Sequence, residues 1–160
     1  MTMANALPFE VTKGFTAVPN VVFYEYLAHP DFKLTTLLVY VLLIDYYNEN
    51  AGGEGVSYAY PTHDQIAKKL LMSRKTVRTA IGTLKQLGLI NVHHNPIGNN
   101  DVYTFNRPIE SAVLFDERFP QAVEYRKKRH KAIERDSDSR QNRQAKFLAE
   151  IKSVQAQSKI

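Results

Sequence analysis

Seven consecutive residues in the middle of the chain combine cationic and hydroxyl side chains in a pattern suited to a polyanion. Residues 73–79 read Ser-Arg-Lys-Thr-Val-Arg-Thr, and side chains of these types donate to phosphates and to base edges. If the segment opens a helix, Ser73 and Arg74 lie at its positive end, where free backbone amides favour a phosphate. The residues that follow are better placed to touch base edges. They are Lys75, Arg78 and Thr79.

A helix from about Arg74 to Leu87 would present these side chains together. Ser73 can cap its N-terminus, and Gly88 stands where a helix end favours a positive φ. At 100° per residue the apolar positions form one stripe, which consists of Val77, Ala80, Ile81 and Leu84. The opposite side is polar and carries Lys75, Thr79, Gly82 and Gln86, with Arg78 on its flank. The major groove of B-DNA, about 12 Å wide, accepts a helix of this kind.

Gly82 is unexpected on an exposed helix face, because glycine costs about 1 kcal/mol relative to alanine there. A backbone that lies close to DNA would explain it. Core contacts that let the helix tolerate this cost would explain it equally well.

A shorter helix and a hairpin are predicted on either side of this segment. Residues 62–65, Thr-His-Asp-Gln, match a capping box, and a helix with one apolar side and Lys68 and Lys69 on the other follows. Leu89–His94 and Asp101–Phe105 predict two strands around a turn. The turn contains no Lys or Arg, so we expect a solvated loop at its tip rather than a DNA contact.

Four elements are predicted before the capping box. A short strand at Phe15–Val18 precedes a helix that Asn20 caps and that runs through Leu27. Thr35 can cap a helix of about 13 residues that ends near Tyr47, although a buried strand is an alternative for so apolar a run. Its apolar residues surround the helix, so either a central core position or a dimer interface would cover it. Val56–Tyr60 predicts another short strand.

The length, composition and motifs of the sequence limit the classes to which the protein can belong. The 160 residues suffice for one domain with appendages. No cysteine is present, and neither a secretory signal nor a membrane-spanning run is found, so we expect a cytoplasmic protein without a membrane partner. Gly52–Gly55 lacks the ending of a phosphate-binding loop, and His93 and His94 would point to opposite faces of a strand. We therefore expect no enzyme, no cofactor and no metal.

The positive charge is concentrated in the last part of the chain. Residues 117–160 hold 12 Lys and Arg against 6 Asp and Glu, whereas residues 1–116 hold 9 against 10. The run Arg126–Lys131 could neutralise phosphates, although a solvated face is the simpler interpretation. A polar stretch around Glu134–Gln144 predicts a flexible or frayed helical segment. Apolar residues then return at helical spacing and are consistent with docking, namely Phe147, Leu148, Ile151 and Val154.

Residues 73–81 and 84–90 resemble the second-helix signature of bacterial winged-helix regulators of the GntR type. The preceding residues, 15–20 and the Leu34-Thr35 pair that opens an apolar helix, resemble the N-terminal winged-helix domain of plasmid replication initiators and phage replisome organisers, the group that includes the primosomal DnaD-like proteins. This resemblance implies binding to origin or operator DNA. The chain departs from it at Leu71, where many such motifs have a glycine, and in its basic tail, where initiators often carry a second folded domain.

The sequence therefore predicts an α+β, mainly helical fold: a winged helix-turn-helix with a C-terminal basic helical tail. We expect a flexible N-terminus at 1–13, a winged-helix DNA-binding domain at 14–107 and a basic, partly helical tail at 108–160. The expected function is sequence-specific binding of double-stranded DNA in plasmid or phage-type replication initiation or its control. A transcriptional regulator of a mobile-element operon and a winged-helix scaffold for protein interactions are the alternatives.

The expected partners are double-stranded DNA, a second copy of the chain, and replication or regulatory proteins that the tail would contact. The predicted DNA-binding residues lie on the two helices of the motif. They are Thr62, Ser73, Arg74, Lys75, Thr76, Arg78, Thr79 and Lys85.

Overall fold

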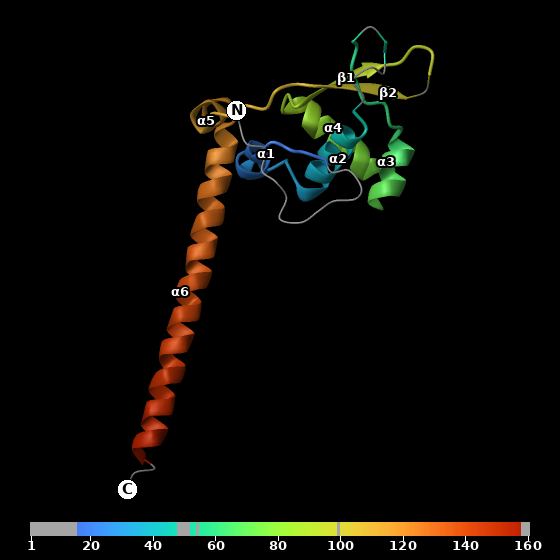
Figure 1. The fold of residues 1–160 in the computed structure, drawn as a ribbon. Helices are drawn as coiled ribbons and strands as arrows, with labels where there is room; N and C mark the ends of the chain where they lie inside the picture. Colours follow the sequence, from blue (N-terminus) through green and yellow to red (C-terminus); the bar gives the residue numbers. More distant parts are fainter. Residues whose placement is uncertain (1–15, 48–51, 54, 99, 158–160) are drawn as a thin grey trace.

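The computed structural model describes residues 16–47, 52–53, 55–98 and 100–157 (Figure 1). In chain order the elements are α1 (Asn20–Tyr24), the short 3₁₀ helix η1 (Tyr26–Ala28), α2 (Leu34–Asp45), α3 (His63–Leu70), α4 (Arg74–Gln86), β1 (Ile90–His94), β2 (Asp101–Phe105), α5 (Ala112–Arg118) and α6 (Pro120–Gln157). This order confirms the predicted α+β, mainly helical winged helix-turn-helix with a helical tail.

Helix α2 lies at the centre of the domain and packs against α4 and α3. Its sequence is apolar on all sides, and six of its twelve residues are buried, namely Thr36, Leu37, Val39, Tyr40, Leu42 and Leu43. Of the two positions proposed for this helix, the central core position is the one observed. Leu34 and Leu38 remain exposed.

Strands β1 and β2 form an antiparallel hairpin whose register pairs Ile90 with Phe105 and His94 with Asp101. The predicted strand at Val56–Tyr60 is wrong, because only single bridge pairs form there, at Tyr58 and Ala59, and Ala59 pairs with Tyr103 through N–O contacts of 2.9 and 2.8 Å. Pro61 has no amide hydrogen to extend the ladder on one side. Gly55, at φ 81°, turns the backbone away on the other.

The N-terminal predictions need two corrections. Residues 16–18 of the predicted strand form no strand, and Phe15 lies outside the described residues. The side chain of Thr16 donates to Asp45 at 3.1 Å. Asn20 is the first residue of α1 rather than its cap, because Pro19 occupies the cap position.

The two helices expected here also have other bounds than predicted. Helix α1 ends at Tyr24, and the chain continues as η1. Likewise Lys33, not Thr35, precedes α2 as the cap residue, without a side-chain bond.

Helix α5 and the first turn of α6 complete the hydrophobic core. The ring of Phe115 lies edge-on to Tyr26 at 4.9 Å and 5.0 Å from Phe119. The hydroxyl of Tyr26 accepts a hydrogen bond from the amide of Ile109 at 3.0 Å, and burial raises the pKa of this phenol. Phe115, Phe119 and Ala122 belong to the same core cluster as the helix-turn-helix, so the core continues beyond residue 107.

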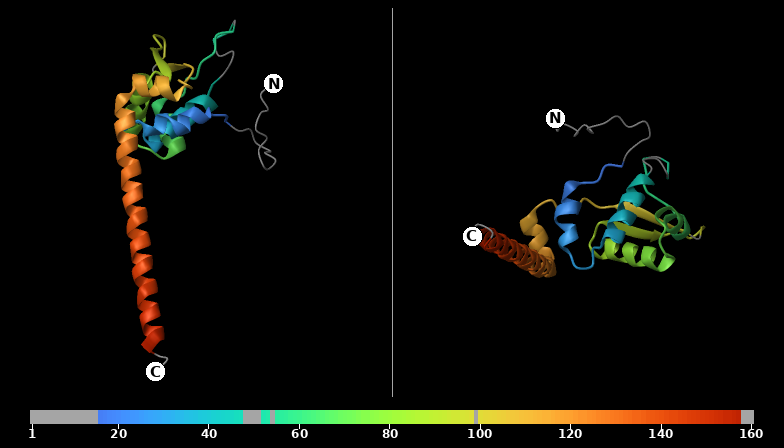
Figure 2. Two further views of the ribbon diagram at one scale, coloured as in Figure 1. Left: turned by 90° about the vertical axis from the view of Figure 1, so that its left-hand side faces the viewer. Right: turned by 90° about the horizontal axis from the view of Figure 1, so that it is seen from below.

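Helix α6 then leaves the domain as a single rod (Figures 1 and 2). Its 38 residues correspond to about 57 Å at 1.5 Å per residue. The stretch around Glu134–Gln144, for which we expected a flexible or frayed helical segment, is part of one continuous helix. Every residue from Lys127 to Ala156 is exposed. None of the described helices combines the length and the apolar character that a membrane span requires.

Candidate nucleic-acid interface

Helices α3 and α4 form the helix-turn-helix, and each is capped as the sequence predicts. The hydroxyl of Thr62 accepts from the amide of Gln65 at 3.1 Å, and the amide of Thr62 donates to the Gln65 side chain at 2.8 Å. Ser73 accepts from the amide of Thr76 at 3.1 Å. Gly88 ends the second helix with φ 72°. These local bonds fix where each helix starts and thereby which side chains of α4 point outward.

The turn between the two helices has the conformation that a glycine would give it. Leu71 adopts φ 54° and ψ 43°, the left-handed region, and its side chain is 94% exposed. The amide of Met72 donates to the carbonyl of Ala67 at 2.9 Å and closes the helix end. Leucine thus stands where many such motifs have a glycine and adopts the left-handed conformation that a glycine would adopt. The cost is backbone strain at Leu71.

We expect Leu71→Gly to raise the free energy of unfolding by about 0.5 to 1 kcal/mol, because glycine adopts this conformation without a Cβ penalty. Urea denaturation followed by circular dichroism measures it. Leu71→Ala is the matched control, since it shortens the exposed side chain but keeps Cβ. An equal gain for both variants would mean that the exposed leucine, and not the backbone conformation, is the source of the cost.

The inner face of α4 is buried as predicted. Val77, Ala80, Ile81 and Leu84 are at most 7% exposed, and they pack toward α2 and α3. Thr83, also buried, donates to the carbonyl of Thr79 at 3.1 Å. Because this face is anchored in the core, the opposite face of α4 is held at the surface in one orientation.

The outer face of α4 is cationic and open to solvent. Exposed on it are Ser73, Arg74, Lys75, Arg78, Thr79, Gly82, Lys85 and Gln86. Thr62, at the start of α3, is also exposed, and Thr76 is half-buried. The structure thus places the eight predicted residues on one continuous region of the helix-turn-helix, with Lys85 about two turns beyond Arg78 on the same flank.

Arg74 differs from the other cations because it is held within the protein. Its guanidinium donates two hydrogen bonds to the carboxylate of Asp64, across the turn between α3 and α4. These bonds lower the pKa of Asp64 and raise that of Arg74. A phosphate would have to compete with this carboxylate for Arg74. Lys75 and Arg78, by contrast, have no ion pair within the described residues.

Two hollows border the outer face of α4. One of about 440 Å³ lies toward the hairpin and joins Thr62, Arg74 and Arg78 to Asn100 and Asp101. In it the Asp101 carboxylate lies 3.7 Å from the ring of His63 and 3.5 Å from that of His94. The end of the hairpin next to its turn is therefore not a simple cationic surface.

The second hollow, of about 330 Å³, lies toward the start of α2. It joins Lys75 and Thr79 to Lys33, Thr35 and Thr36, and Asp31 also borders it. Lys33 was not predicted as a neighbour of the candidate site. No spacing rule could have found it, since more than 40 residues separate it from Lys75 and only the packing of α2 on α4 brings them together.

The basic run in the tail is placed apart from this face, in the first part of α6. Arg126 is engaged, because it contacts Glu25, between α1 and η1, at 2.9 Å and Asp116 of α5 at 3.2 Å, and so fastens α6 to both segments. Lys127 pairs with Glu124 at 3.4 Å. The role of Arg126 is therefore structural. Within the described residues no three His, Asp or Glu side chains are grouped so that they could hold a metal ion.

Residues 33–90 match the family model described as a helix-turn-helix domain. The matched segment starts just before α2 and ends at the first residue of β1, so it covers the three helices that carry and support the outer face. Comparisons with curated proteins and with solved structures found no match. The fold and this match define a helix-turn-helix domain, a class that indicates DNA binding.

Proposed function

We propose that the protein binds specific sites in double-stranded DNA by placing the outer face of α4 in the major groove. The observation that carries this proposal is the cationic, solvent-exposed face of a helix whose other side is buried in the core. A helix anchored in this way can enter a groove about 12 Å wide without distortion of the protein. Lys75, Arg78 and Thr79 then face base edges, and Ser73 and Thr76 face the backbone.

The proposed context is replication initiation, or its control, in a plasmid or phage. The support is the resemblance of residues 15–20 and 34–35 to the N-terminal domain of initiators and replisome organisers, together with the GntR-like pattern of α4. A regulator of a mobile-element operon uses the same DNA contacts and differs only in where its sites lie. A scaffold for protein interactions would instead leave the face of α4 without a DNA partner.

Selection of bound fragments from the native genome by the full chain separates these functions. Enrichment of fragments from a plasmid or phage origin supports initiation, and enrichment upstream of an operon supports regulation. Recovery of fragments without any shared sequence, at the affinity of random DNA, would contradict specific binding and favour the scaffold.

Gly82 provides a test of how closely α4 approaches the DNA. A Cβ added at this position meets no atom within 4 Å, so packing inside the protein does not require glycine there. We expect Gly82→Ala to raise the free energy of unfolding by about 0.5 to 1 kcal/mol and to weaken binding to the selected DNA about tenfold, which equals about 1.4 kcal/mol. Urea denaturation and fluorescence anisotropy measure the two effects. Unchanged affinity in the stabilised variant would remove the argument for close approach.

A further inference from the structure

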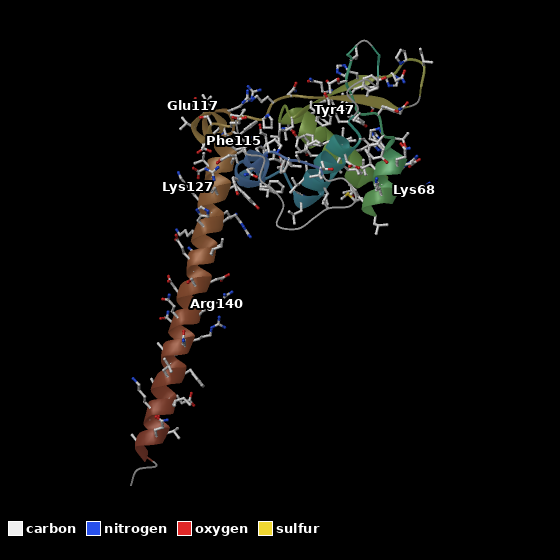
Figure 3. The ribbon with its side chains drawn as sticks, in the orientation of Figure 1. Tyr47, Lys68, Phe115, Glu117, Lys127 and Arg140 are labelled. Carbon is white, nitrogen blue, oxygen red and sulfur yellow. The ribbon has the colours of Figure 1, made fainter. Side chains whose placement is uncertain are left out.

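Helix α6 carries a line of large apolar side chains along the part that extends from the domain. Tyr125, Ile133, Phe147, Ile151 and Val154 fall within an arc of about 80° when each residue advances by 100°. Their exposed fractions range from 37% to 61%. Leu148, half exposed, borders the same arc. Figure 3 shows Lys127 near the domain and Arg140 about halfway along the rod.

This line continues the face by which α6 binds its own domain. Ala122, on the same arc, is buried in the core. Beyond it a groove of about 380 Å³ separates α6 from α1 and η1 and is bordered by Tyr24, Leu27, Tyr125 and Ile133. A single helix gains little stability in water without tertiary packing. Exposed apolar side chains that are grouped, here at Tyr125 and Ile133 and again from Phe147 to Val154, mark a site of interaction. Another helix laid along this arc would fill the groove.

The charges on the same arc identify the occupant. Arg129, Asp136, Arg140 and Arg143 lie on the arc between the apolar residues. A parallel copy of α6 in register would place each of these charges against its own kind. An antiparallel copy centred near residue 138 places Asp136 opposite Arg140 twice, by symmetry.

The same alignment matches the rest of the helix. Phe147 of the second copy comes opposite Arg129, an arrangement that favours a cation–π contact. Ile151 of the second copy comes opposite Tyr125, so that the apolar end of one helix reaches the groove at the base of the other. Glu150 comes beside Lys128, which adds a complementary pair on the flank.

We propose that two copies of the chain associate through α6 in antiparallel orientation, with Asp136 of each copy facing Arg140 of the other. The two helix-turn-helix domains then lie at opposite ends of the paired rod, and their Ala122 anchors are about 48 Å apart. This association does not depend on the DNA-binding function proposed above.

Sedimentation equilibrium of the full chain tests the association. The expected mass is twice the 18.3 kDa of one chain. Ile151→Asp, which places a charge in the apolar line, is expected to give the mass of one chain. Ala149→Asp is the matched control, because it adds the same charge two residues away on the opposite side of α6, and it should keep the double mass. A single-chain mass for the unaltered protein at 100 μM, or equal masses for the two variants, would overturn the proposal.

Disulfide formation tests the orientation, since the chain contains no cysteine. Arg129→Cys and Phe147→Cys chains, mixed and then oxidised, are expected to give a covalent dimer. Either variant alone is expected to give none, because identical residues would be about 27 Å apart in the antiparallel pair, beyond the Cα separation of about 7 Å that a disulfide allows. Cross-linking of either variant alone, or its absence from the mixture, would overturn the antiparallel alignment.

Discussion

Replacement of Lys75 and Arg78 together by alanine is expected to lower the affinity of the full chain for its selected DNA site by at least about thirtyfold. A good contact between a cationic side chain and a base edge contributes about 1 to 3 kcal/mol, and tenfold in affinity corresponds to about 1.4 kcal/mol. Both side chains are exposed on the outer face of α4 and are free of ion pairs within the described residues. Little rearrangement of the protein is therefore needed for them to reach DNA.

Fluorescence anisotropy with the selected duplex and with a duplex of scrambled sequence measures this loss. The matched control is Lys68→Ala with Lys127→Ala, which removes two positive charges from exposed positions outside the outer face of α4 (Figure 3). The control should weaken binding to both duplexes by a similar, smaller factor, because it changes only the general electrostatic attraction. Equal losses for the two double variants on the selected duplex would contradict a role of α4 in reading bases.

Phe115→Ala is expected to lower the free energy of unfolding by about 3 to 4 kcal/mol. Removal of a buried phenylalanine leaves a cavity and forfeits the transfer energy of the ring. Phe115 is fully buried between Tyr26 and Phe119. Its removal would therefore weaken the contact that joins α5 and α6 to the helix-turn-helix. The result would show that the segment after residue 107 stabilises the domain.

Urea denaturation monitored by circular dichroism gives this free energy. Val113→Ala on the same helix is the control, because its side chain is 67% exposed and its truncation should cost less than about 0.5 kcal/mol. If Phe115→Ala behaved like the control, α5 would not contribute to the cooperative fold.

Several parts of the fold that depend on neighbouring residues could be predicted from the sequence, although the caps expected at Asn20 and Thr35 were wrong. The capping box at Thr62, the cap at Ser73 and the positive φ at Gly88 are signals that a few residues carry on their own. They gave α3 and α4 nearly their observed ends. The 3.6-residue period within α4 also separated the buried stripe from the exposed face.

Other predictions that were wrong concern pairing between distant segments. Whether residues 56–60 form a strand depends on partners elsewhere in the chain, and only single bridge pairs form there, such as that of Ala59 with Tyr103. The ring cluster of Tyr26, Phe115 and Phe119 joins residues about 90 positions apart. No local pattern signals such a contact, so the sequence did not indicate that the core continues into α5 and α6.

The candidate site also has some features that local sequence predicts and others that depend on how distant segments pack. The exposure of Lys75, Arg78 and Thr79 follows from the period of one helix and could be predicted. The pair between Arg74 and Asp64 depends on the angle between two helices. That angle is set by the left-handed conformation of Leu71, which sequence alone does not reveal.

Dimethyl sulfate protection of the selected DNA site tests the central claim most directly. The reagent methylates N7 of guanine, which lies in the major groove. If the outer face of α4 enters that groove, guanines within the site should be protected by the full chain, and the Lys75→Ala, Arg78→Ala protein should protect them less at equal occupancy. Full occupancy with every guanine N7 still reactive would contradict the account.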